Sequence, residues 1–470
     1  MAEWASQFEG EHGATELVGL AVDAKGDVAL AGHVLEEGGG RLDGRKDAIV
    51  MKLASRDGDT LWTSRKLGAH GTHDWSTAIA ADRDGNFLVS GQTDGLLFTS
   101  TATIGQDIWV AKLEGQRGEV VWGYQVGSSG QDAASALAVD PNSGDVVVCG
   151  STTGPLFQPA GFDYDPDDVA SQRQEPQRGN TESFCAKLAA VDGQVVWGSR
   201  LTGGPHDGLL AAAVDPDTGD VFAAGFTSDG LGGSDYLAVR LDGSDGQEMW
   251  RAKGGGGWVH STNADAYVKD SVCALAADGL GDVVIAGNTE GALFISTSDG
   301  QGTDAFVSKL NGTDGSPIWG WQGSSSGNDF ANAVAVDSAG DVYACGSAFP
   351  GFFVADDRMS GEGGGAKGEG AAEGEEGEGS SSASEVADMF IAKLDGKSGT
   401  LIWGEQFGSG ADDHAVGLVV GPTSAESRFS SALGAPWGGG GGEEVGRNNP
   451  LYLTGWTRGA LYSNVPGEHQ

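Results

Sequence analysis

Six aspartates recur along the chain, each at the start of a short, mostly apolar segment. They are Asp74, Asp132, Asp207, Asp270, Asp329 and Asp413. Carboxylates that converge can hold a cation or a basic ligand, whereas a separate buried carboxylate accepts hydrogen bonds from its own turn or from a neighbouring segment. Both interpretations are open, and we favour the second.

A further acidic cluster lies in an insert of the chain. Its members are Asp163, Asp165, Asp167 and Asp168. Carboxylates of this kind could bind Ca²⁺, but a solvated acidic loop is the interpretation that we favour. The turns at 140–145 and 215–220 also resemble calcium loops, yet they lack the glutamate at the twelfth position and suit hairpins. No Ser–His–Asp grouping or phosphate-binding loop stands in its required context, so we predict no catalytic residues and no cofactor other than a candidate Ca²⁺.

The charge balance excludes one large class of partner. Acidic residues outnumber basic ones 67 to 27, which gives a net charge of −40. A nucleic-acid backbone would be repelled, so we expect no nucleic acid. We also expect no transmembrane segment, because no apolar run approaches the roughly 18 to 20 residues that span a bilayer. A protein or carbohydrate ligand fits this charge, and we expect a monomer.

The cysteines and one asparagine bear on the cellular compartment. Cys149, Cys185, Cys273 and Cys345 lie in expected strands without CxxC spacing, so we expect buried, reduced thiols; the alternative is a Cys149–Cys185 bridge within one repeat. Residues 311–313, Asn-Gly-Thr, form a glycosylation sequon that matters only in a secreted protein. The first residues show neither the basic nor the apolar region of a signal peptide.

Tryptophans mark an internal repeat. They are Trp4, Trp62, Trp122, Trp197, Trp250, Trp319 and Trp403. In each complete copy, four apolar segments alternate with Gly, Asp and Asn, which is the pattern of strands and turns. In the third copy these strands, named A to D, cover 136–140, 144–150, 182–188 and 193–197.

The C–D hairpin has a constant length. An acid opens strand C 15 positions before the Trp, as Asp107 does before Trp122, and a basic residue such as Lys112 follows five positions after the acid. A glycine such as Gly118 always stands four positions before the Trp and suits a turn with positive φ. Strand C is apolar on both faces, so we expect neighbouring sheets to bury it.

These motifs resemble the SBBP-type β-propeller repeat, in which D-x-F-V-x-K-L is followed by G-x-x-x-W and the A and B strands. The copy at 304–346 fits best. The resemblance implies an all-β, seven-bladed β-propeller with four-stranded antiparallel blades, as a single domain over residues 1–470. The hairpin is also similar, more weakly, to the tryptophan-docking motif of quinoprotein propellers. Since many SBBP-type proteins are extracellular, the compartment stays open: extracellular if the N-terminus is incomplete, otherwise cytoplasmic.

The seventh copy departs from the pattern. It has a strand A at 414–420 and a strand B at 451–456, but the sequence stops where the others continue into strand C. We therefore expect the seventh blade to be incomplete in this sequence. Residues 4–8 have the character of a free strand D and, by analogy with other propellers, would lie beside these last strands.

Inserts suggest which face of the propeller is used. We expect disordered loops at about 155–181, 357–387 and 422–449. B–C and D–A loops share one face of an up-and-down blade, so most of the length variation lies on the face that carries the six aspartates. We predict a non-catalytic binding or scaffold module. The alternative is a propeller enzyme, of hydrolase, lyase or quinoprotein type, with an acidic, metal-assisted site at the channel mouth.

Overall fold

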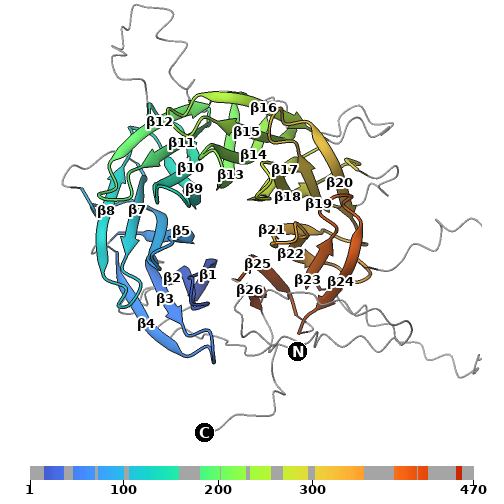
Figure 1. Ribbon diagram of the computed structural model, residues 1–470, viewed down its shortest axis with the longest axis horizontal. Helices are drawn as coiled ribbons and strands as arrows, with labels where there is room; N and C mark the ends of the chain where they lie inside the picture. Colours follow the sequence, from blue (N-terminus) through green and yellow to red (C-terminus); the bar gives the residue numbers. More distant parts are fainter. Residues whose placement is uncertain are drawn as a thin grey trace, which may run out of the picture.

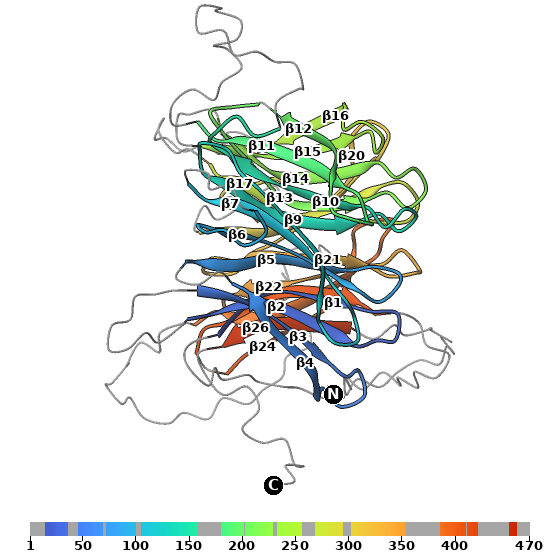
Figure 2. The same cartoon turned by 90° about the vertical axis from the view of Figure 1, so that its left-hand side faces the viewer.

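The computed structural model is a ring of antiparallel sheets around a central axis (Figure 1). It describes residues 15–35, 46–68, 72–99, 105–157, 180–201, 203–228, 233–255, 268–294, 302–353, 386–409, 411–421 and 451–457. Figure 2 shows the ring from the side, with the sheets stacked one above the next. Each sheet is a blade, and its strands follow in chain order from the centre outward.

The strands keep the order A to D that the repeat predicts. The innermost strands, A, are β1 (Thr15–Val22), β5 (Asp74–Ala81), β9 (Asp132–Val139), β13 (His206–Val214), β17 (Asp270–Ala277), β21 (Phe330–Val336) and β25 (Asp413–Val420). The B strands are β2 (Val28–Leu35), β6 (Phe87–Thr93), β10 (Val146–Thr152), β14 (Val221–Ser228), β18 (Val283–Thr289), β22 (Val342–Ala348) and β26 (Leu451–Thr457). The C strands are β3 (Lys46–Leu53), β7 (Asp107–Leu113), β11 (Glu182–Leu188), β15 (Ser234–Leu241), β19 (Asp304–Leu310) and β23 (Asp388–Leu394). The outermost strands, D, are β4 (Thr60–Leu67), β8 (Val120–Val126), β12 (Val195–Leu201), β16 (Glu248–Gly254), β20 (Pro317–Gly323) and β24 (Leu401–Phe407).

The prediction of an all-β propeller with four-stranded antiparallel blades is confirmed, but the described residues form six such blades rather than seven. The remaining sheet contains only β25 and β26. It lies between the sixth and first blades, because Leu418 packs with the sixth blade and Val419 with the first. Strands C and D of a further blade have no counterpart in the described part of the chain after β26.

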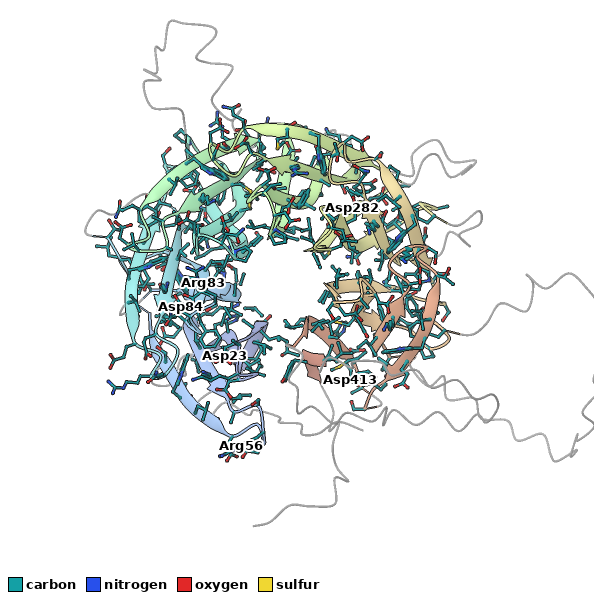
Figure 3. The ribbon with its side chains drawn as sticks, in the orientation of Figure 1. Asp23, Arg56, Arg83, Asp84, Asp282 and Asp413 are labelled. Atoms are coloured by element: carbon teal, nitrogen blue, oxygen red, sulfur yellow. A yellow bond between two sulfur atoms is a disulfide. The ribbon has the colours of Figure 1, made fainter. Side chains whose placement is uncertain are left out.

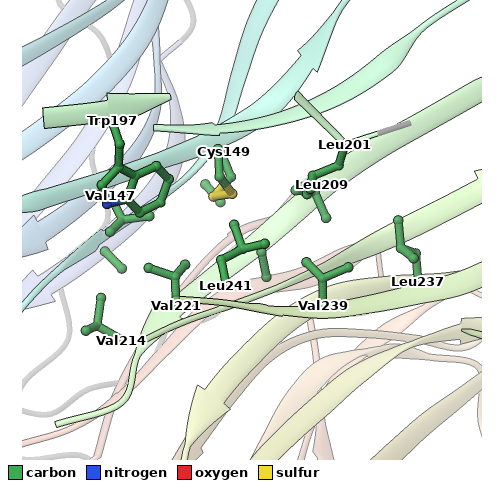
Figure 4. Close-up of a cluster of buried hydrophobic side chains, with 14 residues drawn as sticks. Val147, Cys149, Trp197, Leu201, Leu209, Val214, Val221, Leu237, Val239 and Leu241 are labelled. Carbon is green, nitrogen blue, oxygen red and sulfur yellow. A yellow bond between two sulfur atoms is a disulfide. The ribbon is translucent and has the colours of Figure 1, made fainter. Parts of the chain in front are cut away.

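Burial explains why these segments form strands. Strand β19 is buried along its whole length, as expected for a strand covered on both faces. The core consists of separate apolar clusters between successive blades. In the cluster between the third and fourth blades, Val147 and Trp197 pack against Val221, Val239 and Leu241 (Figure 4). Each blade therefore buries apolar side chains against its neighbours.

The same cluster corrects the prediction for two cysteines. Cys149 and Cys185 form a disulfide rather than buried reduced thiols (Figure 4). The two residues stand directly opposite each other on β10 and β11, with their Cα atoms 4.1 Å apart. Cys273 and Cys345 are free. The pairing depends on the register between strands B and C. This register could not be predicted from the sequence, because the B–C loop varies in length.

Several predicted features fall outside the described residues. These are the segment at 4–8 and nearly all of the inserts at 155–181, 357–387 and 422–449. Within the part of the chain that is described, no helix has the length and apolar character needed to cross a membrane.

Candidate functional site

Each complete blade places one basic side chain of strand C, buried or partly buried, beneath its A–B turn. In the third blade, Lys187 Nζ lies 3.1 Å from Asp140 Oδ2 and 3.9 Å from Asp145 Oδ2. Equivalent ion pairs, with the acid at the start or at the end of the A–B turn, recur at closest N–O distances of 2.7 to 2.9 Å as Lys52–Asp23, Lys112–Asp82, Arg240–Asp220, Lys309–Asp278 and Lys393–Asp341. In the calcium-like turns at 140–145 and 215–220, a side-chain cation thus lies against the carboxylates. Both turns join strands as hairpins, as predicted.

The same turn lowers the pKa of its aspartate. Asp140 Oδ1 accepts a hydrogen bond from Asn142 N, at 2.9 Å, while Oδ2 accepts one from Lys187 Nζ. Burial alone would raise the pKa of Asp140, but the hydrogen bonds from Asn142, Lys187 and Ser143 outweigh burial and hold this pKa below its ordinary value. The carboxylate is therefore ionised at neutral pH and serves as a fixed partner of the lysine.

The repeated tryptophans join each blade to the next. Trp122 Nε1 donates a hydrogen bond to the Ala190 carbonyl in the next C–D turn, at 3.1 Å, and a Cβ added at Gly193 would lie 2.6 Å from Trp122 Cε3. The equivalent bonds are Trp62–Gly115, Trp197–Gly243, Trp250–Gly312 and Trp319–Gly396. The recurrent glycine thus has two roles: it adopts positive φ, as expected, and it leaves space for the ring of the preceding blade.

A glutamine three positions after the Trp is a feature that sequence reasoning missed. Gln125 Nε2 donates to the Gly95 carbonyl and to Asp107 Oδ2, at 2.7 and 2.8 Å, while its Oε1 accepts from Leu97 N and Phe98 N. Gln322 makes the same set of bonds in the fifth blade. The motif T-x-G-x-L-F after strand B, present at 93–98 and 289–294, was the available signal. The glutamine fixes the start of the B–C loop on the face opposite the A–B turns.

The six recurrent aspartates lie on this loop face, at the beginning of the innermost strands, and each is at most 1% exposed. Asp132 accepts hydrogen bonds from Ser128 Oγ and Thr152 Oγ1, and Asp413 accepts them from Ser409 N and Oγ. Asp74, Asp207 and Asp329 likewise accept bonds from nearby turn or strand residues. Asp270 is buried at the same position of β17. Contacts of this kind fit the interpretation that each carboxylate accepts hydrogen bonds from its own turn or from a neighbouring segment.

The backbone of the same aspartates joins adjacent blades. Asp132 N donates to the Gln106 carbonyl, just before strand C of the preceding blade, and Asp413 N donates to the Ala387 carbonyl. This arrangement brings an acid of strand C near the aspartate of the next blade. The pKa of Asp388 is raised by burial and by the negative charge of Asp413. Burial also raises the pKa of Glu182, although Arg200, 2.7 Å away, opposes that rise.

The structure does not test the metal prediction. Asp163, Asp165, Asp167 and Asp168 lie outside the described residues. Within the ranges that are described, no three His, Cys, Asp or Glu side chains are grouped as a metal site requires. Calcium binding by this insert or by the ring of aspartates remains a prediction.

One polar hollow lies on the turn face, between the first and second blades. Its lining includes Asp23, Lys25, Arg83, Asp84 and Glu114, of which Figure 3 labels Asp23, Arg83 and Asp84. Its volume is about 220 Å³, below the range of roughly 300 to 1,000 Å³ typical of ligand pockets. Both signs of charge line it, so it has no clear preference for an anion or a cation.

Comparisons with known proteins agree with the repeat. Residues 61–98 match the family model described as SBBP, a β-propeller repeat. No curated protein matches the chain. Similar solved structures include the acylaminoacyl peptidase of Pyrococcus horikoshii, with 10% identity, a TM-score of 0.36, and 71% of this chain and 43% of that one covered. Another is the quinohemoprotein alcohol dehydrogenase ADHIIG of Pseudomonas putida HK5, with 11% identity, a TM-score of 0.30, and coverages of 67% and 60%. This chain covers less than two thirds of either structure.

Proposed function

We propose that this chain, whose repeats are of the SBBP β-propeller type, is a non-catalytic binding or scaffold module that uses its loop face. One observation carries the proposal: the two faces of the ring differ in how their residues are used. On the turn face, the A–B and C–D turns are engaged by buried ion pairs and by tryptophans from the preceding blades. Connections of very different length emerge on the loop face, from rigid strand ends. Loops held on a rigid scaffold are where binding sites commonly lie.

The charge narrows the class of ligand. At a net charge of −40, the protein repels polyanions, so a protein or a carbohydrate is the proposed ligand. Five of the six buried aspartates accept side-chain hydrogen bonds from nearby turn or strand residues, and we assign all six to scaffold rigidity rather than to ligand contact. Ser129 and Gln131 are exposed residues of a D–A loop, and we propose that residues of this kind contact the ligand.

We also propose that β25 and β26 are the inner half of a seventh blade. Trp403, in the sixth blade, is only half-buried, and its Nε1 has no acceptor among the residues described here, whereas five equivalent tryptophans dock on the next blade. Residues 457–462, T-R-G-A-L-Y, continue the motif that follows strand B in other blades. Residues 4–8 carry a Trp and a Gln three positions apart, as strand D does.

Oriented immobilisation tests the proposed binding face. Ser129→Cys adds an attachment point in a D–A loop, and Gln116→Cys adds one in a C–D turn; both residues are exposed. Both variants also carry Cys273→Ser, so that the added thiol is the reactive one. The probes are arrays of purified oligosaccharides and of purified extracellular proteins.

Saturable binding should survive attachment through residue 116 and be lost on attachment through residue 129. The opposite pattern, or equal binding by both variants, would place the ligand elsewhere and overturn the proposed face. The absence of any saturable binding on either array would count against a binding module. An unchanged melting temperature of each variant shows that attachment, rather than unfolding, causes the difference.

A further inference from the structure

One C–D turn contains an asparagine whose side-chain nitrogen makes no hydrogen bond to the described residues. Asn311 begins the turn between β19 and β20 and is followed by Gly312 and Thr313. Its Oδ1 accepts a hydrogen bond from Thr313 N, at 2.8 Å. Its Nδ2 makes no hydrogen bond to the described residues, and Thr313 is exposed. The turn therefore presents a side-chain amide beside an accessible hydroxyl.

The equivalent turns show that this nitrogen is not needed for the fold. Asp242 Oδ1 accepts from Ser244 N at 2.8 Å, and Asp395 Oδ1 accepts from Lys397 N at 3.1 Å. An aspartate thus caps the turn as well as Asn311 does. The asparagine differs by carrying an amide that can be modified, and the sequence Asn-Gly-Thr is the acceptor pattern for N-linked glycans.

The disulfide is an independent indication of the compartment. Cys149 and Cys185 are fully buried and bonded within the third blade. Structural disulfides form and persist in oxidising compartments such as the lumen of the endoplasmic reticulum, and they are rare in the cytosol. N-linked glycans are added in that same lumen. The disulfide therefore indicates the secretory compartment, which is where the sequon can be glycosylated.

We propose that Asn311 carries an N-linked glycan and that the protein matures in the secretory pathway. The donor is a lipid-linked oligosaccharide pyrophosphate. In the transfer, the Asn311 amide nitrogen forms a bond to C1 of the first sugar, the bond from C1 to the pyrophosphate oxygen breaks, and the amide loses one proton. The lipid pyrophosphate is the leaving group, and no oxidant or reductant is consumed.

The position of the turn determines which face of the ring the glycan covers. The Gly312 carbonyl accepts hydrogen bonds from Trp250 Nε1 and from the Arg240 guanidinium, both in the preceding blade. This docking holds the turn on the face opposite the B–C and D–A loops. The glycan shields the turn face and leaves the loop face open. The modification itself is independent of the proposed binding function, because it can occur whether or not that face binds a ligand.

Mass spectrometry of the native protein, isolated from the cells that make it, tests the proposal. The peptide that contains Asn311 is treated with an amidase that removes N-glycans, in heavy-oxygen water. We expect heavy-labelled Asp at position 311 only after this treatment. An unmodified Asn311 peptide in the native protein would overturn the proposal.

Variants secreted from eukaryotic cells behind a cleavable leader test the turn. The wild-type chain should lose gel mobility through one glycan, and Thr313→Ala should remove this shift while keeping the turn, because the capping bond uses the backbone of residue 313. Asp242→Asn creates Asn-Gly-Ser in a matched turn and should add a second glycan. A wild-type chain without a glycan beside a modified Asp242→Asn variant would show that the site is not used.

Thiol counting of the denatured native protein tests the compartment. We expect the free thiols of Cys273 and Cys345 alone before reduction, and all four cysteines after reduction. Four reactive thiols before reduction would contradict the disulfide on which the secretory assignment rests.

Discussion

Removing a tryptophan that donates a hydrogen bond to the next blade should destabilise the ring more than removing one without such an acceptor. Trp122 is 9% exposed, packs in an apolar cluster and donates to the Ala190 carbonyl of the next blade. Truncation of a buried Trp to Ala costs about 3–5 kcal/mol because contacts are lost and a cavity remains. The carbonyl left without its donor adds about 1 kcal/mol. We expect Trp122→Ala to lower the free energy of unfolding by about 4 kcal/mol or more.

The chain provides a matched control for this substitution. Trp403 occupies the same position of the sixth blade, but it is half-buried and has no described acceptor for its Nε1. Trp403→Ala should therefore cost at least about 1 kcal/mol less than Trp122→Ala, since no interblade hydrogen bond is lost. Trp122→Phe keeps most of the packing and should fall between the wild type and Trp122→Ala.

Urea denaturation, followed by far-UV circular dichroism, measures these differences. The midpoint should fall most for Trp122→Ala, and the slope of the transition should stay unchanged if the unfolded states are alike. Equal losses for Trp122→Ala and Trp403→Ala would refute the argument that docking on the next blade stabilises the ring. A lower slope would instead indicate that the blades no longer unfold together.

The remaining predictions concern turns and charges. Gly118→Ala should cost clearly more than Gly279→Ala in urea denaturation, because both have positive φ but only at Gly118 would a Cβ meet a tryptophan ring, at 2.6 Å; equal costs would contradict this role. Lys187→Met should cost about 3–5 kcal/mol, since Asp140 would stay buried without its partner. Because the pKa of Asp140 is lowered in the fold, its stabilising contribution is present above the unfolded-state pKa of about 4 and is lost as the pH falls. The acid-induced drop in stability should therefore be shallower in Lys187→Met, and an unchanged pH profile would count against the pairing. The pKa of Asp388 is raised, so its ionisation destabilises the fold as the pH rises; Asp388→Asn should raise the melting temperature at pH 7 but not at pH 3, and a gain at both would point to another cause.

Much of the fold could be predicted from short-range patterns. The recurrence of Trp122 and its counterparts, with an acid 15 positions earlier, predicted the C and D strands of every complete blade. Strand β11 begins and ends where the sequence placed it, at Glu182 and Leu188. Seven blades were predicted, the last of them incomplete, because the repeat count takes the seventh copy as a blade. The described residues form six blades and a sheet that contains only β25 and β26.

The candidate site was less accessible to prediction. The six aspartates could be found from their recurrence, but their burial and their hydrogen bonds to Ser and Thr residues could not. A carboxylate at the start of a strand has the same local sequence whether it faces a ligand or its own turn. The contacts of Gln125 were likewise missed, because the residues that they join are 18 to 30 positions apart.

By itself, the sequence determined the elements of this protein: alternating apolar residues specify the strands, and Gly, Asp and Asn specify the turns between them, since these are properties of adjacent residues. Only the tertiary structure decided which elements meet. The tryptophans donate hydrogen bonds to carbonyls 46 to 77 positions away. Cys149 forms a disulfide with Cys185, on the other side of a B–C loop whose length varies between blades. Such contacts depend on strand register and on closure of the ring, in which each blade buries its faces against its neighbours. No local pattern encodes these distances.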